Sequence, residues 1–343
     1  MTSPELVEAA SRLLPSGAGV AAKLYARAFA TGRLEPEALG VSAASARAWR
    51  ECFRVGELAV RSVTEEEGEI GVTAKAVLAT ADGELVECVR VPVPTSTGEL
   101  RATLCISSQV GCRMGCVFCE TGSRGFTRNL TASEIVAQVV TARSVLGWEC
   151  RNVVFMGMGE PLDNFDEVAR ALRILTDNRG LRYAWERITV CTSGEAQGIA
   201  RLRALGWKRL NLSISLNAAD DETRSALMPV NRRTDLAALS SALAAYPQRR
   251  GFALGVNYCL LPGINDSREH AQGVGDYLRR LGRAQLNLIP YNPGSAAITR
   301  APTAEETARF LAWLTEAGVD TKVRAARGSS IMAGCGQLGS GAG

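Results

Sequence analysis

The larger part of the chain repeats one hydrophobic pattern. After Arg101, short apolar runs rich in β-branched residues alternate with longer segments in which apolar residues recur at helical spacing. This alternation requires parallel strands joined by crossover helices. We therefore predict an α/β fold, a partial parallel barrel of six strand–helix units, spanning residues 101–343 and including a C-terminal tail. Strands are expected near residues 102–107, 151–156, 187–192, 209–216, 252–261 and 285–290, with a seventh short run at 320–325.

Two segments with different patterns precede the barrel. Residues 1–55 are rich in alanine and leucine at helical spacing, which predicts a small helical accessory domain. Residues 56–100 carry short β-type runs at 59–63, 71–78 and 85–93, which predict a hairpin-like β connector. Within the barrel, the sequences beginning at Thr131 and Thr303 each have a glutamate three residues later, and such capping boxes predict helix starts.

Composition narrows the class of protein. The 343 residues are 46% hydrophobic and 22% charged, which is ordinary for a soluble enzyme. The N-terminus has no basic segment followed by an apolar run, and no apolar run reaches the roughly 18 residues of a membrane span. We therefore expect a cytoplasmic protein with no membrane partner. The net charge of +4 permits a nucleic-acid partner without requiring one.

Ten cysteines in such a chain point to metal binding or chemistry, because cytosolic thiols rarely form structural disulfides. Cys112, Cys116 and Cys119 follow the first barrel strand in a C-x3-C-x2-C loop, which can wrap three corners of a cubane cluster. Iron–sulfur clusters usually take four thiolates, so three leave one iron open to a ligand. A structural zinc site is the alternative, but zinc needs a fourth ligand and the single histidine, His270, is far along the chain.

Small and polar residues follow several other barrel strands, at the end where parallel barrels carry their chemistry. The second strand leads into a Gly-Met-Gly-Glu-Pro loop, in which glycine lets the backbone approach a ligand and the glutamate can pair with an ammonium group. The same sequence could be an ordinary strand-to-helix turn, and polar strand ends are common in parallel barrels. The candidate cofactor-binding residues at these ends are Gly159, Glu160, Cys191, Ser215, Leu216, Asn217 and Asn292.

Two further cysteines lie at either end of the barrel sequence. Cys335 is in a glycine-rich tail that is too flexible to be a core element, so a structural role is not expected. Cys105 lies on the strand that enters the cysteine loop, where a buried structural thiol would be usual.

Together these motifs resemble those of a specific family, the radical S-adenosylmethionine (SAM) dual-cysteine RNA adenine methylases. It comprises the 23S ribosomal RNA and tRNA adenine carbon-2 methylases and the carbon-8 methylases of antibiotic resistance. The resemblance covers about residues 58–338. It rests on the runs at 105–112, 125–131, 156–161, 260–266, 287–293 and 335–338.

The resemblance implies the following chemistry. A [4Fe–4S] cluster on Cys112, Cys116 and Cys119 would bind SAM, and two SAM molecules would be used per turnover. Cys335 would accept a methyl group, a hydrogen would be removed from it, and the resulting carbon radical would add to adenine. Cys105 would then deprotonate the ring carbon, and the link to RNA would break as a disulfide forms with Cys335.

By the same resemblance Glu87 would lie in the active site as a proton acceptor, although the sequence alone indicates a solvated strand residue. The implied partners are rRNA or tRNA and a reductant of the flavodoxin or ferredoxin type, and the expected state is a monomer. Carbon 2 of adenine is the expected target, with carbon 8 open.

Some positions depart from the family pattern. A serine is usual where Cys191 stands, a histidine where Asn217 stands, and a small residue where Glu120 stands. Residues 328–332 lack the acidic side chains usual in carbon-2 enzymes. Two alternatives therefore stay open: a related enzyme acting on another RNA or a small molecule, and a non-catalytic RNA-binding paralogue. The remaining cysteines, at positions 52, 88, 150 and 259, are expected to be small buried residues, and His270 to lie on a helix surface.

Overall fold

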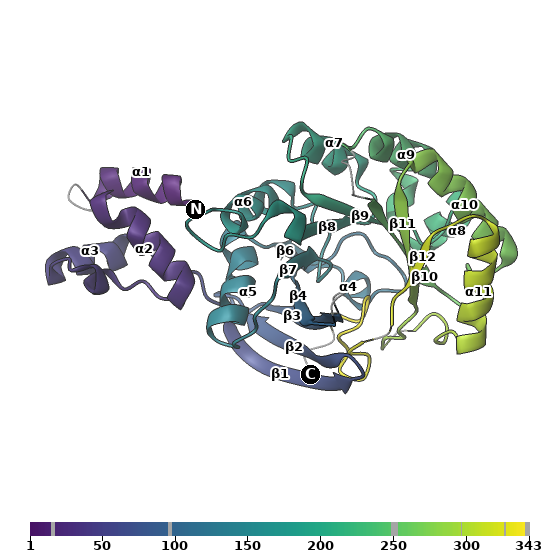
Figure 1. The fold of residues 1–343 in the computed structure, drawn as a ribbon, viewed down its shortest axis with the longest axis horizontal. Helices are drawn as coiled ribbons and strands as arrows, with labels where there is room; N and C mark the ends of the chain where they lie inside the picture. Colours follow the sequence, from purple (N-terminus) through teal and green to yellow (C-terminus); the bar gives the residue numbers. More distant parts are fainter. Residues whose placement is uncertain (15–17, 95–97, 248–252, 296, 326, 340–343) are drawn as a thin grey trace.

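The computed structural model describes residues 1–14, 18–94, 98–247, 253–295, 297–325 and 327–339. Its centre is a ten-stranded sheet in the order β1-β2-β3-β4-β7-β8-β9-β10-β11-β12 (Figure 1). The strands of this sheet are β1 (Ala59–Gly68), β2 (Gly71–Ala79), β3 (Leu85–Pro94), β4 (Leu100–Cys105), β7 (Asn152–Phe155), β8 (Ile188–Thr192), β9 (Asn211–Ser215), β10 (Leu254–Leu260), β11 (Ala284–Pro290) and β12 (Thr321–Val323).

From β4 to β12 every neighbouring pair of strands is parallel, which confirms the predicted α/β barrel and its seven strands. The predicted start of the fifth strand at residue 252 lies outside the described residues. The longer helices cover the outside of the curved sheet (Figure 1). The helices of the barrel, long and short, are α4 (Glu120–Ser123), α5 (Ala132–Ser144), α6 (Phe165–Leu175), η2 (Trp185–Arg187), α7 (Ala196–Ala204), α8 (Asp221–Leu227), η3 (Pro229–Arg232), α9 (Leu236–Ala244), α10 (Arg268–Leu281) and α11 (Ala304–Glu316).

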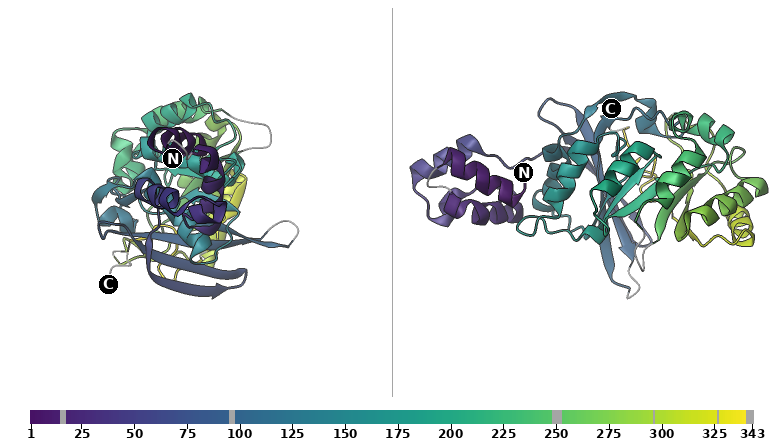
Figure 2. Two further views of the ribbon diagram at one scale, coloured as in Figure 1. Left: turned by 90° about the vertical axis from the view of Figure 1, so that its left-hand side faces the viewer. Right: turned by 90° about the horizontal axis from the view of Figure 1, so that it is seen from above.

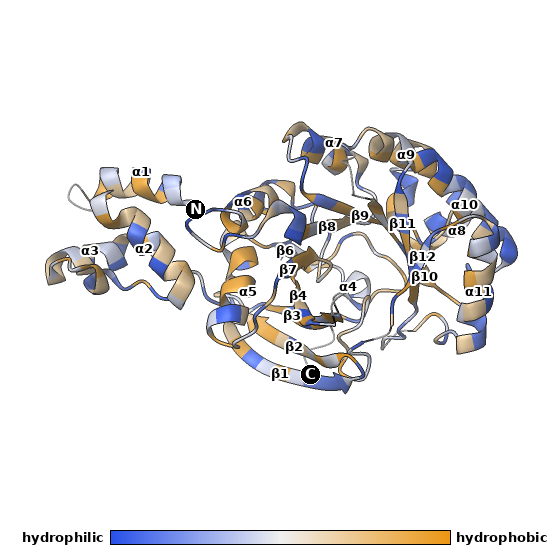
Figure 3. Ribbon diagram, in the orientation of Figure 1, coloured by the Kyte–Doolittle hydropathy of each residue, from blue (hydrophilic) through white to orange (hydrophobic). Residues whose placement is uncertain are grey.

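Burial of apolar side chains between sheet and helices forms the main core. Helix α5 is buried over most of its length and is predominantly hydrophobic in Figure 3. Both predicted capping boxes are confirmed, since Thr131 begins α5 and Thr303 begins α11 with reciprocal side-chain and backbone bonds. Ser267 begins α10 in a similar way, with its hydroxyl bonded to the ring nitrogen Nδ1 of His270, so His270 lies on the helix as expected.

The β connector is part of the barrel sheet. Strands β1, β2 and β3 are antiparallel to one another, and β3 pairs antiparallel with β4, the first barrel strand. β1 is longer than predicted and extends through an exposed run of glutamates to Gly68. The strand can continue through this polar run because its backbone pairs with β2 as far as Gly68, while most of the glutamate side chains stay exposed.

The N-terminal segment forms helices α1 (Ser3–Leu13), α2 (Ala18–Thr31), η1 (Pro36–Leu39) and α3 (Ala43–Cys52), as predicted for residues 1–55. They have a small core of their own, which includes Leu24 and Trp49. This unit projects from one side of the barrel next to α5 and α6 (Figures 1 and 2). The Ser3 amide donates a 2.7 Å hydrogen bond to Asp177 just beyond α6. The division of the chain at residues 55 and 100 stays a prediction.

A second, two-stranded sheet was not predicted. β5 (Gln109–Gly111) pairs antiparallel with β6 (Phe126–Asn129), and the two strands bracket the cysteine loop. Gly111 has a φ of +73°, and a Cβ there would collide with the Gly125 carbonyl, so glycine is required where these strands meet. No helix within the described residues has the length and apolar character needed to cross a membrane.

Candidate active site

A pocket opens at the C-terminal ends of the parallel strands and has a volume of about 160 Å³. The three cysteines of the predicted cluster loop, Cys112, Cys116 and Cys119, line it together. Cys335 of the tail lines the same pocket, although it is more than two hundred residues away in sequence. Of the candidate cofactor residues, the pocket is lined by Gly159, Glu160, Cys191, Ser215 and Asn217.

The backbone holds the cysteine loop in place. The Cys112 amide donates to the Gly125 carbonyl at 2.7 Å, and the Cys119 amide donates to Cys116 at 3.2 Å. Burial raises the pKa of the Cys112 thiol to about 12. In the described part of the chain, no three His, Cys, Asp or Glu side chains are placed to share a single metal ion. Three thiols around one pocket fit a cluster, in which each thiolate binds a different iron, better than a mononuclear zinc site.

The Gly-Met-Gly-Glu loop is held against β5 by Gln109, which sequence reasoning missed. Gly159 has a φ of +97°, and a Cβ there would lie 2.5 Å from Cβ of Gln109. The Glu160 amide donates to Oε1 of Gln109 at 2.8 Å, and the Gln109 amide donates to the Met158 carbonyl at 3.2 Å. Glycine is therefore needed at position 159 for both conformation and close approach.

The Glu160 side chain is buried, and its carboxylate accepts hydrogen bonds from two neighbouring residues. Its Oε2 accepts hydrogen bonds from the Ser193 amide at 2.7 Å and the Ser193 hydroxyl at 2.8 Å, and its Oε1 accepts from the Leu162 amide at 3.0 Å. Burial raises the pKa of Glu160, and the bonds from Ser193 and Leu162 oppose that rise. Ser193 was not predicted, although its place directly after the third barrel strand could have indicated it.

The ends of β8 and β9 are joined by polar contacts. The Cys191 sulfur lies 3.8 Å from the Ser215 hydroxyl and accepts a 3.3 Å hydrogen bond from Asn257, and burial raises its pKa to about 12. Arg224, which is fully buried, donates to the carbonyls of Ser193 at 2.6 Å and Ser215 at 3.2 Å. Arg224 and Asn257 were also missed, because nothing local in the sequence marks a buried arginine or asparagine.

Asn217 points its side chain at the neighbouring strand. Its Oδ1 accepts from the Cys259 amide at 2.9 Å, and its backbone has a φ of +58°, in the left-handed region that asparagine tolerates better than most residues. Leu216 is fully buried in the core and does not line the pocket. Asn292 is also outside the lining residues, and its amide lies against Gly334 of the tail, where a Cβ would be 2.9 Å from Nδ2.

Cys105 ends β4 and is almost fully buried. Burial raises the pKa of its thiol, and a negative charge on Cys335 would raise it further. Cys335 is an exposed residue that lines the pocket. Burial raises its pKa, and the positive charge of Arg324 opposes the rise.

The tail that carries Cys335 is tied to the barrel on both sides of the cysteine. The Glu120 amide donates to the Gly336 carbonyl at 2.7 Å, and the Thr121 hydroxyl donates to the Leu338 carbonyl at 2.6 Å. On the other side, Lys75 Nζ donates to the Met332 carbonyl at 3.2 Å. The glycines of the tail predicted a flexible segment, but residues 327–339 are ordered and cross the barrel mouth. We call these residues the strap.

Glu87 is not the solvated residue that its sequence context suggested. It is 2% exposed on β3, its Oε1 lies 3.8 Å from Lys75 Nζ, and its Oε2 accepts a 2.9 Å hydrogen bond from the Gly339 amide. The cause is the strap, which covers this face of the connector. Glu120 is likewise buried, and its carboxylate accepts from the amide and hydroxyl of Ser295.

The remaining cysteines differ from one another. Cys88 is buried as expected, whereas Cys52 is exposed at the end of α3, so that expectation was wrong. Cys259 is buried but also lines the active-site pocket, and Cys150 is half-buried in a second cavity.

Comparison with known proteins agrees with this geometry. The family model of the Radical SAM superfamily matches residues 106–272. The dual-specificity RNA methyltransferase RlmN of Syntrophobacter fumaroxidans is 42% identical over 307 residues, which are 85% of this chain and 87% of the relative. The chain belongs to the RlmN family of radical SAM dual-specificity RNA methyltransferases.

Other relatives of this family support the same assignment. A probable dual-specificity RNA methyltransferase RlmN of Protochlamydia amoebophila is 43% identical over 269 residues, 78% of this chain and 74% of the relative. The crystal structure of a radical SAM methyltransferase from Sphaerobacter thermophilus superposes with a TM-score of 0.88 at 36% identity, covering 99% of this chain and 98% of that one. The predicted family, fold and class of enzyme are confirmed. The cofactors of the RlmN family are a [4Fe–4S] cluster and SAM, two per turnover, as predicted.

Proposed function

We propose that this protein methylates a ring carbon of adenine in rRNA or tRNA, carbon 2 with carbon 8 as the alternative, through a methylated cysteine. The observation that carries the proposal is the placement of Cys335 in the pocket that the cluster-loop cysteines line. Neither a small-molecule enzyme nor an inert RNA-binding protein needs a tail thiol held in that position.

The cofactor ligands follow from the lining of the pocket. Cys112, Cys116 and Cys119 would hold the cluster. Gly159, Glu160, Cys191, Ser215 and Asn217 would hold SAM, with backbone at Leu216 and Asn292 shaping the ends of their strands. When bound, the cluster and SAM supply the methyl group and the one-electron chemistry that activates it.

The thiols of Cys335 and Cys105 would carry out the remaining steps of the methyl transfer. The Cys335 sulfur would accept the methyl group, and once one of its hydrogens had been removed by the bound cofactors, the remaining methylene carbon would bond to the adenine ring carbon and so link RNA to the tail. Cys105 would remove the proton from the ring carbon, and the bond between Cys335 and the methyl-derived carbon would break as the two thiols join in a disulfide. Glu87, close to the tail, would accept a proton in this sequence.

The partners and setting follow from this chemistry. A flavodoxin-type or ferredoxin-type protein would supply electrons to the cluster, and the reducing cytoplasm would return the disulfide to thiols. We propose a monomer with a helical accessory domain at residues 1–55, a β connector at 56–100 and the radical SAM core with its catalytic tail at 101–343.

Two measurements test the proposal. RNA digested from a deletion strain should lack one methyladenosine that the parent strain contains. After anaerobic reconstitution with SAM, the purified protein should carry one extra methyl group on the tryptic peptide with Cys335, and Cys335→Ala should lose it. Cys52→Ala, which changes an exposed cysteine of the accessory domain, is the matched control. Unchanged RNA together with an unmethylated tail would contradict the proposal.

A further inference from the structure

A second cavity lies at the opposite end of the barrel from the active site. It has a volume of about 350 Å³ and is lined by the segments that lead into β7 and β8. Those segments precede the strands, whereas the active-site residues follow them. The cavity is therefore separated from the active site by the length of the strands.

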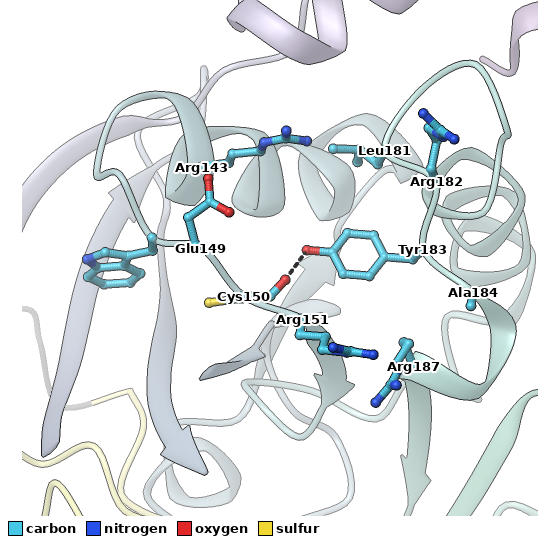
Figure 4. Close-up of a pocket in the computed structure, with 10 residues that line it drawn as sticks. Arg143, Glu149, Cys150, Arg151, Leu181, Arg182, Tyr183, Ala184 and Arg187 are labelled. Carbon is cyan, nitrogen blue, oxygen red and sulfur yellow. Dashed lines mark hydrogen bonds between the residues drawn. The ribbon is translucent and has the colours of Figure 1, made fainter. Parts of the chain in front are cut away.

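Arginines dominate its lining. Arg143 and Arg151 come from one segment and Arg182 and Arg187 from the other, and Glu149 is the one acidic residue among the lining residues. Figure 4 shows Arg143 on one side of the cavity, and Arg151 and Arg187 together on the other. Within the described residues, none of the four arginines that line the cavity has an ion-pair partner. Other arginines do form ion pairs, such as Arg209 with Glu186.

The positive charges are close enough to affect one another. Repulsion from Arg101 and Arg187 lowers the pKa of Arg151. Uncompensated like charges destabilise a folded protein unless an anion neutralises them. Guanidinium groups bind phosphate through two hydrogen bonds at once, and four arginines with a single carboxylate among them give the lining an excess of such donors.

The walls of the cavity are rigid. The Tyr183 hydroxyl donates a 2.9 Å hydrogen bond to the Cys150 carbonyl and ties the two segments together across the cavity (Figure 4). Arg182 has a φ of +60°, a conformation that costs about 1 kcal/mol or more for a non-glycine residue. The other two non-glycine residues with positive φ in the described chain are Asn217 in the active-site pocket and Met332 in the strap. Backbone strain of this kind concentrates at functional sites.

The cavity also adjoins the accessory domain. Beside the 181–187 segment, Ser3 of α1 bonds to Asp177, and a Cβ on Gly180 would lie 2.9 Å from the Tyr25 ring of α2. A polyanion that contacts both the accessory domain and the barrel would pass this position.

We propose that this cavity is a phosphate-binding site that takes backbone phosphates of the RNA at a distance from the reacting adenine. The choice of RNA as the source of the phosphate rests on the proposed function, and a free phosphate compound is the other source of the same chemistry. Either ligand would bring negative charge to the arginines of the cavity.

The test uses the full chain with its cluster and three variants. Arg151→Gln with Arg187→Gln removes two charges from the cavity, and Arg151→Lys with Arg187→Lys keeps them. Arg280→Gln with Arg283→Gln removes two exposed charges at the end of α10 and serves as the matched control. Binding of unfractionated tRNA and of purified 23S rRNA is measured from low to moderate salt.

For RNA phosphates, the glutamine pair should weaken binding about fivefold or more and reduce the slope of log K against log salt by about 1 to 2, whereas the control pair should change neither. The lysine pair should keep most of the slope. For a free phosphate source, millimolar inorganic phosphate should raise the melting temperature of the wild type and not that of the glutamine pair. Unchanged RNA binding together with no stabilisation by phosphate would overturn the site.

Methylation of Cys335 in the absence of RNA separates this test from the proposed function. It should be equal in the wild type and all three variants, because the cavity is far from the strap. If Cys335 is never methylated, the proposed function fails while the binding data still decide the cavity.

Discussion

The amide of Glu120 donates a 2.7 Å hydrogen bond to the carbonyl of Gly336. Glu120 directly follows the last cysteine of the cluster loop, and Gly336 directly follows the tail cysteine. One hydrogen bond thus sets the distance between the proposed cluster and the proposed methyl acceptor. The next residue repeats the arrangement, with Thr121 bonded to Leu338.

Thr121→Val should loosen the strap, because the Thr121 hydroxyl bonds the Leu338 carbonyl. It removes a buried hydroxyl donor and leaves the Leu338 carbonyl unpaired, at a cost of about 1–3 kcal/mol. We expect faster hydrogen exchange in residues 332–339 and slower methylation of Cys335. Thr307→Val on α11, where an exposed threonine bonds within its own helix, is the control. Unaltered exchange in the strap would show that this bond does not hold it.

Lys75 and Glu87 should behave as a coupled pair. Both are buried, and each holds one part of the strap through Met332 or Gly339. Lys75→Met should destabilise the protein by about 3 kcal/mol or more, because it leaves a buried carboxylate without its ammonium partner. Adding Glu87→Gln should recover part of that loss. Denaturation of the four proteins gives the coupling energy, and strictly additive changes would argue against the pair.

Several of these features lay beyond sequence reasoning for a common reason. The barrel strands and the capping boxes at Thr131 and Thr303 could be predicted because their signals are local and periodic. Glu87 reads as solvated from its neighbours on β3, and only the strap, about 250 residues later, buries it. Gln109 and Ser193 act on Glu160 across distant loops, so their roles depend on packing that no local pattern records.

Cys105→Ala should trap an RNA–protein crosslink. Without the Cys105 thiol, the proposed deprotonation cannot occur and the adenine would stay bonded to Cys335. The crosslink should appear as a slow-migrating band on a denaturing gel after reaction with RNA and should disappear on nuclease treatment. Cys88→Ala, which changes a buried cysteine of the neighbouring strand, should release free product. Free product from the Cys105 variant would remove its assigned role.

Glu160→Gln should change the pH dependence of stability. Because burial raises the pKa of Glu160 in the folded protein, the folded state holds this proton more tightly than the unfolded state. The stability from that proton is fully present below the unfolded pKa of about 4.5 and is lost as pH rises through the folded pKa. The glutamine variant lacks this loss, so its stability relative to wild type should increase from pH 4 to pH 8 in urea denaturation. A constant difference across that range would show that Glu160 titrates normally.

Asn217 allows backbone strain and side-chain bonding to be separated at one position. Its φ of +58° disfavours a Cβ, and its Oδ1 accepts from the Cys259 amide. Asn217→Gly removes the side-chain acceptor but relaxes the backbone, whereas Asn217→Ala removes the acceptor and keeps the strain. The alanine variant should therefore be less stable than the glycine variant by about 1 kcal/mol. Equal stabilities in chemical denaturation would mean that the left-handed conformation costs nothing here. SAM binding should weaken in both variants, because both lose the asparagine side chain at a position that lines the pocket.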